Sequence, residues 1–274
     1  MFRLSAFTAL LFALISAPSA SGVILYNSQG AGGDLMVQRN NVSAQRADGL
    51  LLIKIQSGDA ENNGNDRLGL IKFDLTQLPA ESISAASVRI SLPRGAATGQ
   101  PNNAFAAGDS LYLYGVPDGS AGEDFALDTT TTFANYPHFT GVGSVANPRP
   151  ASDLTANGVN DDLTPLLATY TFEAASDAGQ FVDFHSSALT SFLQADSNGI
   201  ATFILATGGQ TINPATKTPT VASGQGDVAT NNPTWRPALL TNSDAVVPEP
   251  TSIAMLLSGA SCAVALRRRS ARQR

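Results

Sequence analysis

The stretch NDRLGLIKFDLTQLP at residues 65–79 constrains the fold of this chain more than any other. After a polar turn, its residues alternate between two faces, with Gly69, Ile71, Phe73 and Leu75 on one and Leu70, Lys72 and Asp74 on the other. A period of two is typical of a half-buried β-strand. Leu78-Pro79 ends the pattern, because proline has no amide hydrogen for a sheet ladder. We therefore expect a strand here with Phe73 in the core.

A second alternating segment follows almost at once, with Val88, Ile90 and Leu92 on one face. Two neighbouring strands joined by a polar loop predict the start of an antiparallel sheet. The composition agrees with a loop-rich β protein, since the chain has 24 glycines and only 14% charged residues.

Other segments add strands and one helix to this plan. Further strands are predicted at residues 23–26, 35–38, 49–55, 111–116, 168–172, 180–184, 200–206 and 237–241. Residues 186–194 are the best helical candidate, because Leu189, Phe192 and Leu193 are helically spaced and Ser186 can cap the first turn. Residues 117–162 lack a clear period and predict mostly loop.

The first strand pair also carries a family resemblance. Asp66-Arg67-Leu68, Phe73-Asp74-Leu75, Leu78-Pro79 and Ser84-Ala85 occur in the order typical of the DNRLRE-type domain of secreted bacterial and archaeal proteins. The chain resembles that domain loosely over residues 23–244, and departs from it at Gly69, where the family has a larger residue. The resemblance implies an all-β, jelly-roll-like antiparallel β-sandwich, and some such domains are carbohydrate-binding modules. It gives the charged positions Arg67 and Asp74 a structural role.

The charge is unevenly divided along the chain. The whole sequence carries 16 basic and 22 acidic side chains. Residues 22–248 hold 21 of the acidic and 10 of the basic ones, a net charge near −11. An acidic body argues against nucleic acid and anionic membrane surfaces as partners, and suits neutral glycans or divalent cations. The single cysteine, Cys262, lies outside this body, so disulfide and zinc-thiolate sites are excluded there.

The first 21 residues are predicted to be a signal peptide. Arg3 supplies a positive start, residues 6–15 are apolar, and residues 16–22 are small residues suited to cleavage. This leader predicts export through the Sec translocon and removal by signal peptidase. The folded domain is then expected at residues 22–245.

Residues 246–274 form a third segment. Val247, Pro248, Glu249 and Pro250 precede an apolar run at residues 253–266, and Arg267, Arg268 and Arg269 follow. This order resembles the PEP-CTERM sorting signal, which implies recognition by an exosortase-type membrane protease. The run of 14 residues would span roughly 21 Å at about 1.5 Å per residue, less than the bilayer core of about 30 Å. Transient inner-membrane insertion is therefore expected, with the arginines cytoplasmic. An unprocessed tail anchor is the other interpretation.

Catalytic machinery is hard to find in the sequence. His138 and His185, the two histidines, have no metal-ligand spacing, and a structural role is expected for each. The neighbouring acids Asp161-Asp162 and Glu123-Asp124 could imitate a glycosidase dyad, but that chemistry needs two carboxyls across a cleft. We therefore predict no catalytic residues.

The sequence does not identify a particular ligand-binding site either. The loop at residues 59–66 is rich in oxygen ligands for a structural calcium ion, although such residues also simply make turns. No other metal or cofactor is predicted, and the ligand-binding residues are unknown. The aromatic residues that could stack on sugars, with core packing as the more frequent role, are Tyr26, Tyr112, Tyr114, Tyr136 and Trp235.

These features together predict a non-catalytic protein of the cell surface or an exopolysaccharide matrix, sorted by an exosortase, with glycan binding left open. The alternative is an extracellular polysaccharide-degrading hydrolase or its accessory module.

Overall fold

The computed structural model describes residues 22–39, 48–54, 66–78, 83–95, 104–128, 130–140, 151–155, 157–208 and 219–242. Residues 23–241 form one compact unit, and almost all of the other unit, residues 1–22 with 242–274, lies outside the described residues. The predicted signal peptide and the predicted apolar tail lie outside the described residues. Of the helices within the described ranges, none is long and apolar enough to cross a membrane.

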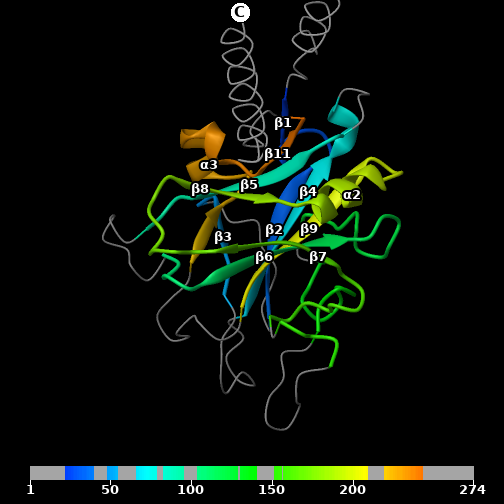
Figure 1. Ribbon diagram of the computed structural model, residues 1–274, viewed down its shortest axis with the longest axis horizontal. Coiled ribbons are helices and arrows are strands. Elements are labelled where there is room, and N and C mark those ends of the chain that lie inside the picture. Colours follow the sequence, from blue (N-terminus) through cyan, green and yellow to red (C-terminus); the bar gives the residue numbers. More distant parts are fainter. Residues whose placement is uncertain are drawn as a thin grey trace, which may run out of the picture. The chain divides into compact units, whose positions relative to one another are not determined.

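The unit is all-β, with antiparallel sheets and few helices (Figure 1). The strands are β1 (Val23–Tyr26), β2 (Gly33–Gln38), β3 (Leu50–Leu52), β4 (Arg67–Asp74), β5 (Ala86–Leu92), β6 (Ser110–Val116), β7 (Leu166–Thr171), β8 (Gln180–His185), β9 (Ile200–Thr207), β10 (Thr220–Ala222) and β11 (Ala238–Thr241). The short helices are η2 (Leu75–Gln77), α2 (Ser187–Gln194), α3 (Asp227–Asn231) and η5 (Pro233–Trp235).

Two larger sheets share one core. One has the order β1-β11-β5-β8, the other β2-β4-β9-β6-β7, and β10 pairs with β3 in a small third sheet. The apolar cluster between the larger sheets takes Val88, Ile90 and Val182 from the first and Ile71 and Phe73 from the second. This is a β-sandwich, in which each strand buries its alternate residues against the facing sheet.

The strand predicted at β4 is confirmed with its two faces, but it is not half-buried as predicted, because Leu70, Lys72 and Asp74 on its other face are buried as well. Ile71 and Phe73 are fully buried between the sheets, and Phe73 meets Phe203 edge to face with ring centroids 5.9 Å apart. Gly69 lies on the same inner face, and a side chain there would meet Ile53 Cδ1 at 3.0 Å. The absence of a side chain at Gly69 thus makes room for the segment that contains β3.

Two details of the first strand pair were predicted wrongly. The strand ends at Asp74 and Leu75 begins the 3-10 helix η2, because the Asp74 carboxylate caps that turn by accepting from Thr76 N at 3.1 Å. The neighbouring strands β4 and β5 do not form a hairpin, since β4 lies in the five-stranded sheet and β5 in the four-stranded one. Alternation fixes the faces of a strand but not its partner.

Most of the remaining predicted elements are confirmed with small shifts at their ends, but the strand predicted at residues 49–55 is only Leu50–Leu52, and residue 55 lies outside the described residues. Ser186 caps α2, where its Oγ accepts from Leu189 N at 2.9 Å. β9, predicted as a continuously buried strand, lies between β4 and β6 in the five-stranded sheet (Figure 1). Two elements were not predicted: β10, whose three residues are too few to show a period, and the single-turn helix α3.

Candidate functional site

The outer face of the five-stranded sheet is covered by the connection between β6 and β7. Its described residues form turns and a β-bridge between Phe139 and Val159. The prediction of mostly loop is therefore confirmed, yet this loop is packed. The second apolar cluster consists of Leu35, Val37, Leu68, Leu70, Tyr114, Val116, Phe125, Phe133, Tyr136, Phe139, Val159, Ile204 and Ala206. The sheet thus has a core on each of its faces.

Buried polar contacts fix the far half of this connection. The Tyr114 hydroxyl lies 2.7 Å from Thr155 Oγ1 and accepts from Asn157 Nδ2 at 2.8 Å. The Asp153 carboxylate accepts from the backbone amides of Asn157 and Gly158 at 2.9 and 3.0 Å. Burial raises the pKa of Tyr114 well above its usual range, so its hydroxyl keeps its proton.

His138 also holds the connection between β6 and β7 in place. Its Nδ1 lies 2.9 Å from Thr164 Oγ1 and its Nε2 lies 3.0 Å from the Ala121 carbonyl oxygen. Burial lowers the pKa of His138, which favours the neutral ring. Both ring nitrogens therefore hold turns of the connection in place, a structural role.

His185 lies exposed at the end of β8. The neighbouring Ser186 hydroxyl donates to the Leu167 carbonyl oxygen at 2.6 Å while it caps α2. Both contacts of the Ser186 hydroxyl are therefore structural.

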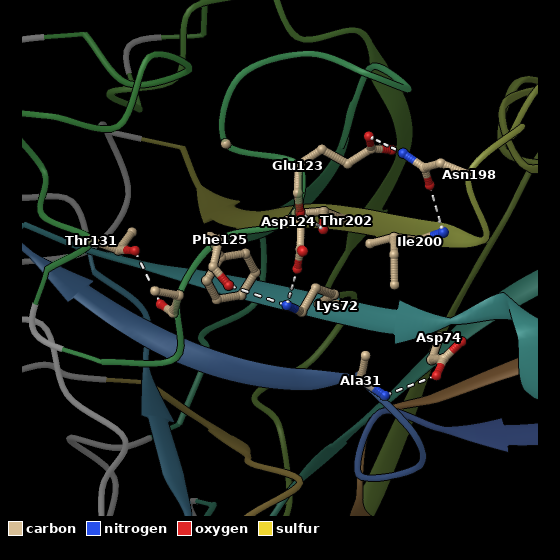
Figure 2. A network of polar contacts seen from close by, with 12 residues as sticks. Ala31, Lys72, Asp74, Glu123, Asp124, Phe125, Thr131, Asn198, Ile200 and Thr202 are labelled. Carbon is tan, nitrogen blue, oxygen red and sulfur yellow. Dashed lines mark hydrogen bonds and ion pairs between the residues drawn. The ribbon is translucent and has the colours of Figure 1, made fainter.

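The neighbouring acids Glu123 and Asp124 bind different partners (Figure 2). Asp124 Oδ1 accepts from the nearly buried Lys72 Nζ at 2.6 Å, and Lys72 also donates to the Phe125 carbonyl oxygen at 3.1 Å. The Lys72 ammonium lies 5.2 Å from the centre of the Phe125 ring. Lys72 thus ties the connection to β4.

The Glu123 carboxylate instead accepts from Gly119 N and Asn198 Nδ2, each at 2.7 Å. In the other acid pair, Asp161 Oδ2 accepts from Leu154 N at 2.6 Å. These contacts give the carboxylates of Glu123 and Asp161 structural partners.

Three carboxylates meet where this connection approaches the turn before β9. One oxygen each of Asp118, Glu123 and Asp196 lies within 4.8 Å of the others. Burial raises the pKa of Glu123, and the charges of Asp118 and Asp196 raise it further. Burial likewise raises the pKa of Asp196, with Asp118 adding to the shift. Such a cluster has the oxygen-ligand chemistry that calcium uses.

The calcium site predicted from the sequence lies elsewhere, in the loop at residues 59–66. Residues 55–65 lie outside the described residues. Asp66 is buried and lies 3.4 Å from Arg39 Nη1. The three clustered carboxylates were missed because they are far apart in the sequence, and the only local signals were the turns Asp118-Gly119 and Asp196-Ser197-Asn198-Gly199.

The charged residues Arg67 and Asp74, singled out in the sequence, make hydrogen bonds that hold the fold together. Arg67 Nε donates to Gln38 Oε1 at 3.2 Å. Asp74 Oδ2 accepts from Ala31 N at 2.8 Å (Figure 2). Hydrogen bonds, first from the Thr76 hydroxyl, lower the pKa of Asp74 despite its burial. Among the aromatic candidates, Tyr114 and Tyr136 are buried, and Tyr26, Tyr112 and Trp235 are half-buried.

A pocket of about 390 Å³ lies where β7 runs over into β8. Its lining includes Tyr170, Phe172, Glu173, Asp177 and Gln180. Tyr170 accepts a hydrogen bond from Gln180 Nε2 at 3.4 Å, which links the edge strands of the two sheets. The sequence pattern gave no sign of this pocket, because Tyr170 and Gln180 read as ordinary strand residues.

Comparisons with known proteins give no family for this chain. No protein-family model matches it, and no curated protein matches its sequence. The predicted sorting-signal residues are Val247, Pro248, Glu249, Pro250, Arg267, Arg268 and Arg269, and they lie outside the described residues.

Proposed function

We propose that this protein is an exported, non-catalytic component of the cell surface or an exopolysaccharide matrix, with a DNRLRE-type body and a PEP-CTERM-type tail. The observation that carries the proposal is the order of Val247-Pro248-Glu249-Pro250, the apolar residues 253–266 and the arginines at 267–269. The apolar run halts the chain in the inner membrane, and the arginines hold its end in the cytoplasm.

The Pro-Glu-Pro segment is suited to a protease cleft. Pro248 and Pro250 lack amide donors and have a fixed φ, which favours an extended segment outside any helix. Glu249 adds one charge for recognition. Cleavage by an exosortase-type protease near this segment frees the body for transfer to the surface.

The finer architecture that we propose for the body is a jelly roll. Its strand pairs are nested: β1 with β11, β4 with β9, β5 with β8 and β6 with β7. Nested pairs arise when one long antiparallel hairpin folds over into two sheets, which is how the two Greek keys of a jelly roll form. This order supports the resemblance to secreted surface domains.

A hydrolase is the less favoured alternative. His138 uses both ring nitrogens to hold turns, Ser186 caps a helix, and Asp124 is paired with Lys72. Groups engaged in this way are poorly placed to act as nucleophile or base. These contacts support a non-catalytic role.

Intact-mass analysis of the surface-associated protein tests the proposal. We expect a mature chain that has lost the segment after about Pro250. A variant with Pro248→Ala, Glu249→Ala and Pro250→Ala should remain membrane-bound at full tail length, because the extended recognition segment is gone. The neighbouring variant Thr251→Ala with Ser252→Ala is the matched control and should be processed normally. A mature surface protein that still carries residues 253–274 would identify a plain membrane anchor and contradict the proposal.

A further inference from the structure

The turn between α2 and β9 contains an asparagine followed by a glycine, Asn198-Gly199. A backbone nitrogen can attack the side-chain amide of the asparagine before it, because the product is an unstrained five-membered ring. Glycine permits this attack best, since it carries no Cβ beside its nitrogen. Gly199 has a φ of +83°, a conformation that favours glycine, and Asn198 is exposed to water. The turn thus holds both reactants of a side-chain cyclisation.

Three hydrogen bonds hold the reacting atoms of this turn. Gly199 N donates to Asp196 Oδ1 at 2.8 Å, which places a base on the attacking nitrogen. Ile200 N donates to Asn198 Oδ1 at 2.8 Å, where negative charge develops when the amide carbon is attacked. Asn198 Nδ2, the leaving nitrogen, donates to Glu123 Oε2 at 2.7 Å (Figure 2). Each atom that changes its charge or its proton therefore already has a partner.

The two carboxyl groups are suited to moving these protons. Burial raises the pKa of Asp196, so its carboxylate is a stronger base than that of an exposed aspartate. Burial also raises the pKa of Glu123, so this group more readily holds the proton that ammonia needs when it leaves. The charge of Asp118 adds to both shifts. A base and an acid thus lie at opposite ends of the reacting amide.

Another Asn-Gly turn within the described residues, Asn157-Gly158, shows what is particular to Asn198. At both turns the glycine nitrogen donates to an aspartate, and the next nitrogen donates to the asparagine Oδ1. At Asn157, however, Nδ2 donates to the Tyr114 hydroxyl at 2.8 Å, and the residue is fully buried. Burial raises the pKa of Tyr114 well above its usual range, which makes its hydroxyl a poor proton donor. Exposure to water and a carboxyl group at the leaving nitrogen therefore distinguish Asn198.

We propose that Asn198 is a self-modification site, which the protein converts to aspartate and isoaspartate. Asp196 takes the proton of Gly199 N, and this nitrogen forms a bond to Asn198 Cγ. The bond from Cγ to Nδ2 then breaks, and the nitrogen leaves as ammonia with a proton from Glu123. A proton that returns from Asp196 to Glu123 restores both groups. Water hydrolyses the succinimide ring at either carbonyl carbon, which gives aspartate or isoaspartate.

The conversion changes the cluster of three carboxylates formed by Asp118, Glu123 and Asp196. An ionised carboxylate only accepts hydrogen bonds, so the product at position 198 cannot donate to Glu123 as the amide does. It also brings a fourth negative charge to the cluster. The reaction therefore adds charge where the fold already concentrates it.

Peptide mapping by mass spectrometry tests the site in the purified full-length protein during incubation at neutral pH. We expect Asn198 to convert at least about tenfold faster in the folded protein than in the same chain unfolded in guanidinium chloride, because only the fold supplies the base and the acid. Asn157 should stay unconverted while the protein is folded. This comparison needs no substitution, so it holds even where a variant fails to fold.

Two substitutions separate the roles of the carboxyl groups. Asp196→Ser keeps a hydroxyl acceptor for Gly199 N but removes the base, and it should slow the conversion of Asn198 at least about tenfold. Glu123→Gln should slow it as well, because an amide cannot supply the proton that ammonia needs. An unchanged melting temperature or a higher one verifies that each variant is folded.

Asp162→Asn is the matched control, since Asp162 is an exposed acid elsewhere on the connection between β6 and β7, and it should leave the rate at Asn198 unchanged. Conversion of Asn198 that is no faster in the folded protein than in the unfolded chain overturns the inference. Conversion of Asn157 at the same rate, or an unchanged rate in either folded variant, also overturns it.

Discussion

The five-stranded sheet packs against a different kind of partner on each face. Its inner face meets a second sheet, and alternate residues of β4 such as Ile71 and Phe73 interleave with those of β5 and β8. Its outer face meets turns, which contribute aromatic rings such as Phe125 and Phe139 together with buried hydroxyl, amide and carboxylate groups. A strand needs only a period of two to build the first core, whereas the second core needs particular residues to satisfy the polar groups of each turn.

The inner core should show the largest response to a single truncation. Phe73→Ala removes a fully buried ring between the sheets, so we expect unfolding in denaturant to lose about 3–5 kcal/mol. The matched control is Phe181→Ala, because Phe181 lies on β8 and is 40% exposed, and it should lose less than about 1 kcal/mol. A loss below about 1 kcal/mol for Phe73→Ala would place that side chain outside the core and refute the register given for β4.

The outer core should respond to the loss of a single oxygen atom. Tyr114→Phe keeps the ring but leaves the buried Asn157 amide without its acceptor, so we expect a loss of about 1–3 kcal/mol in denaturant unfolding. Tyr112→Phe, two residues away on the same strand and half-buried, is the control and should change stability by less than about 0.5 kcal/mol. Equal effects of the two changes would mean that packing alone holds the turns, as it holds the inner core.

The smallest expected effect is a gain in stability from a substitution at Glu123, in the connection that covers the outer face of the five-stranded sheet. The raised pKa of Glu123 means that the folded protein binds this proton more tightly than the unfolded chain does. The resulting stabilisation is complete below the unfolded value of about 4.3 and is lost as the pH rises through the folded pKa. Glu123→Gln removes the repelling charge and should therefore raise the melting temperature at pH 7 in chelator, with the gain vanishing toward pH 4.

The adjacent acid provides the opposite sign as a control. Asp124→Asn weakens the contact with Lys72 and should lower the melting temperature at pH 7. If Glu123→Gln lowered it as well, the hydrogen bonds from Gly119 and Asn198 would outweigh the repulsion from Asp118 and Asp196.

The same contrast explains how far sequence reasoning reached. The faces of β4, the buried strand β9 and the cap Ser186 could all be predicted, because each is signalled by residues within a few positions of one another. The hairpin between β4 and β5 was predicted wrongly, since alternation does not say which sheet a strand joins.

The candidate sites could not be predicted, because they are formed by residues that come together only in the folded protein. Glu123 meets Asp196, and Tyr170 meets Gln180, only once the connections have folded over the sheets. The turns at Asp118 and Asp196 resemble many surface turns, so their local sequence could not reveal the cluster.

The position of β11 has a consequence for the timing of folding. The last strand of the body is inserted between β1 and β5, so the four-stranded sheet cannot close until residue 241 is available. The first and last strands pair across the whole body, a contact of very long sequence separation that makes closure slow. A chain emerging from its amino-terminal end would therefore hold β1 without its partner until synthesis of the body is complete. Anything that delays the arrival of β11 therefore delays closure of the four-stranded sheet.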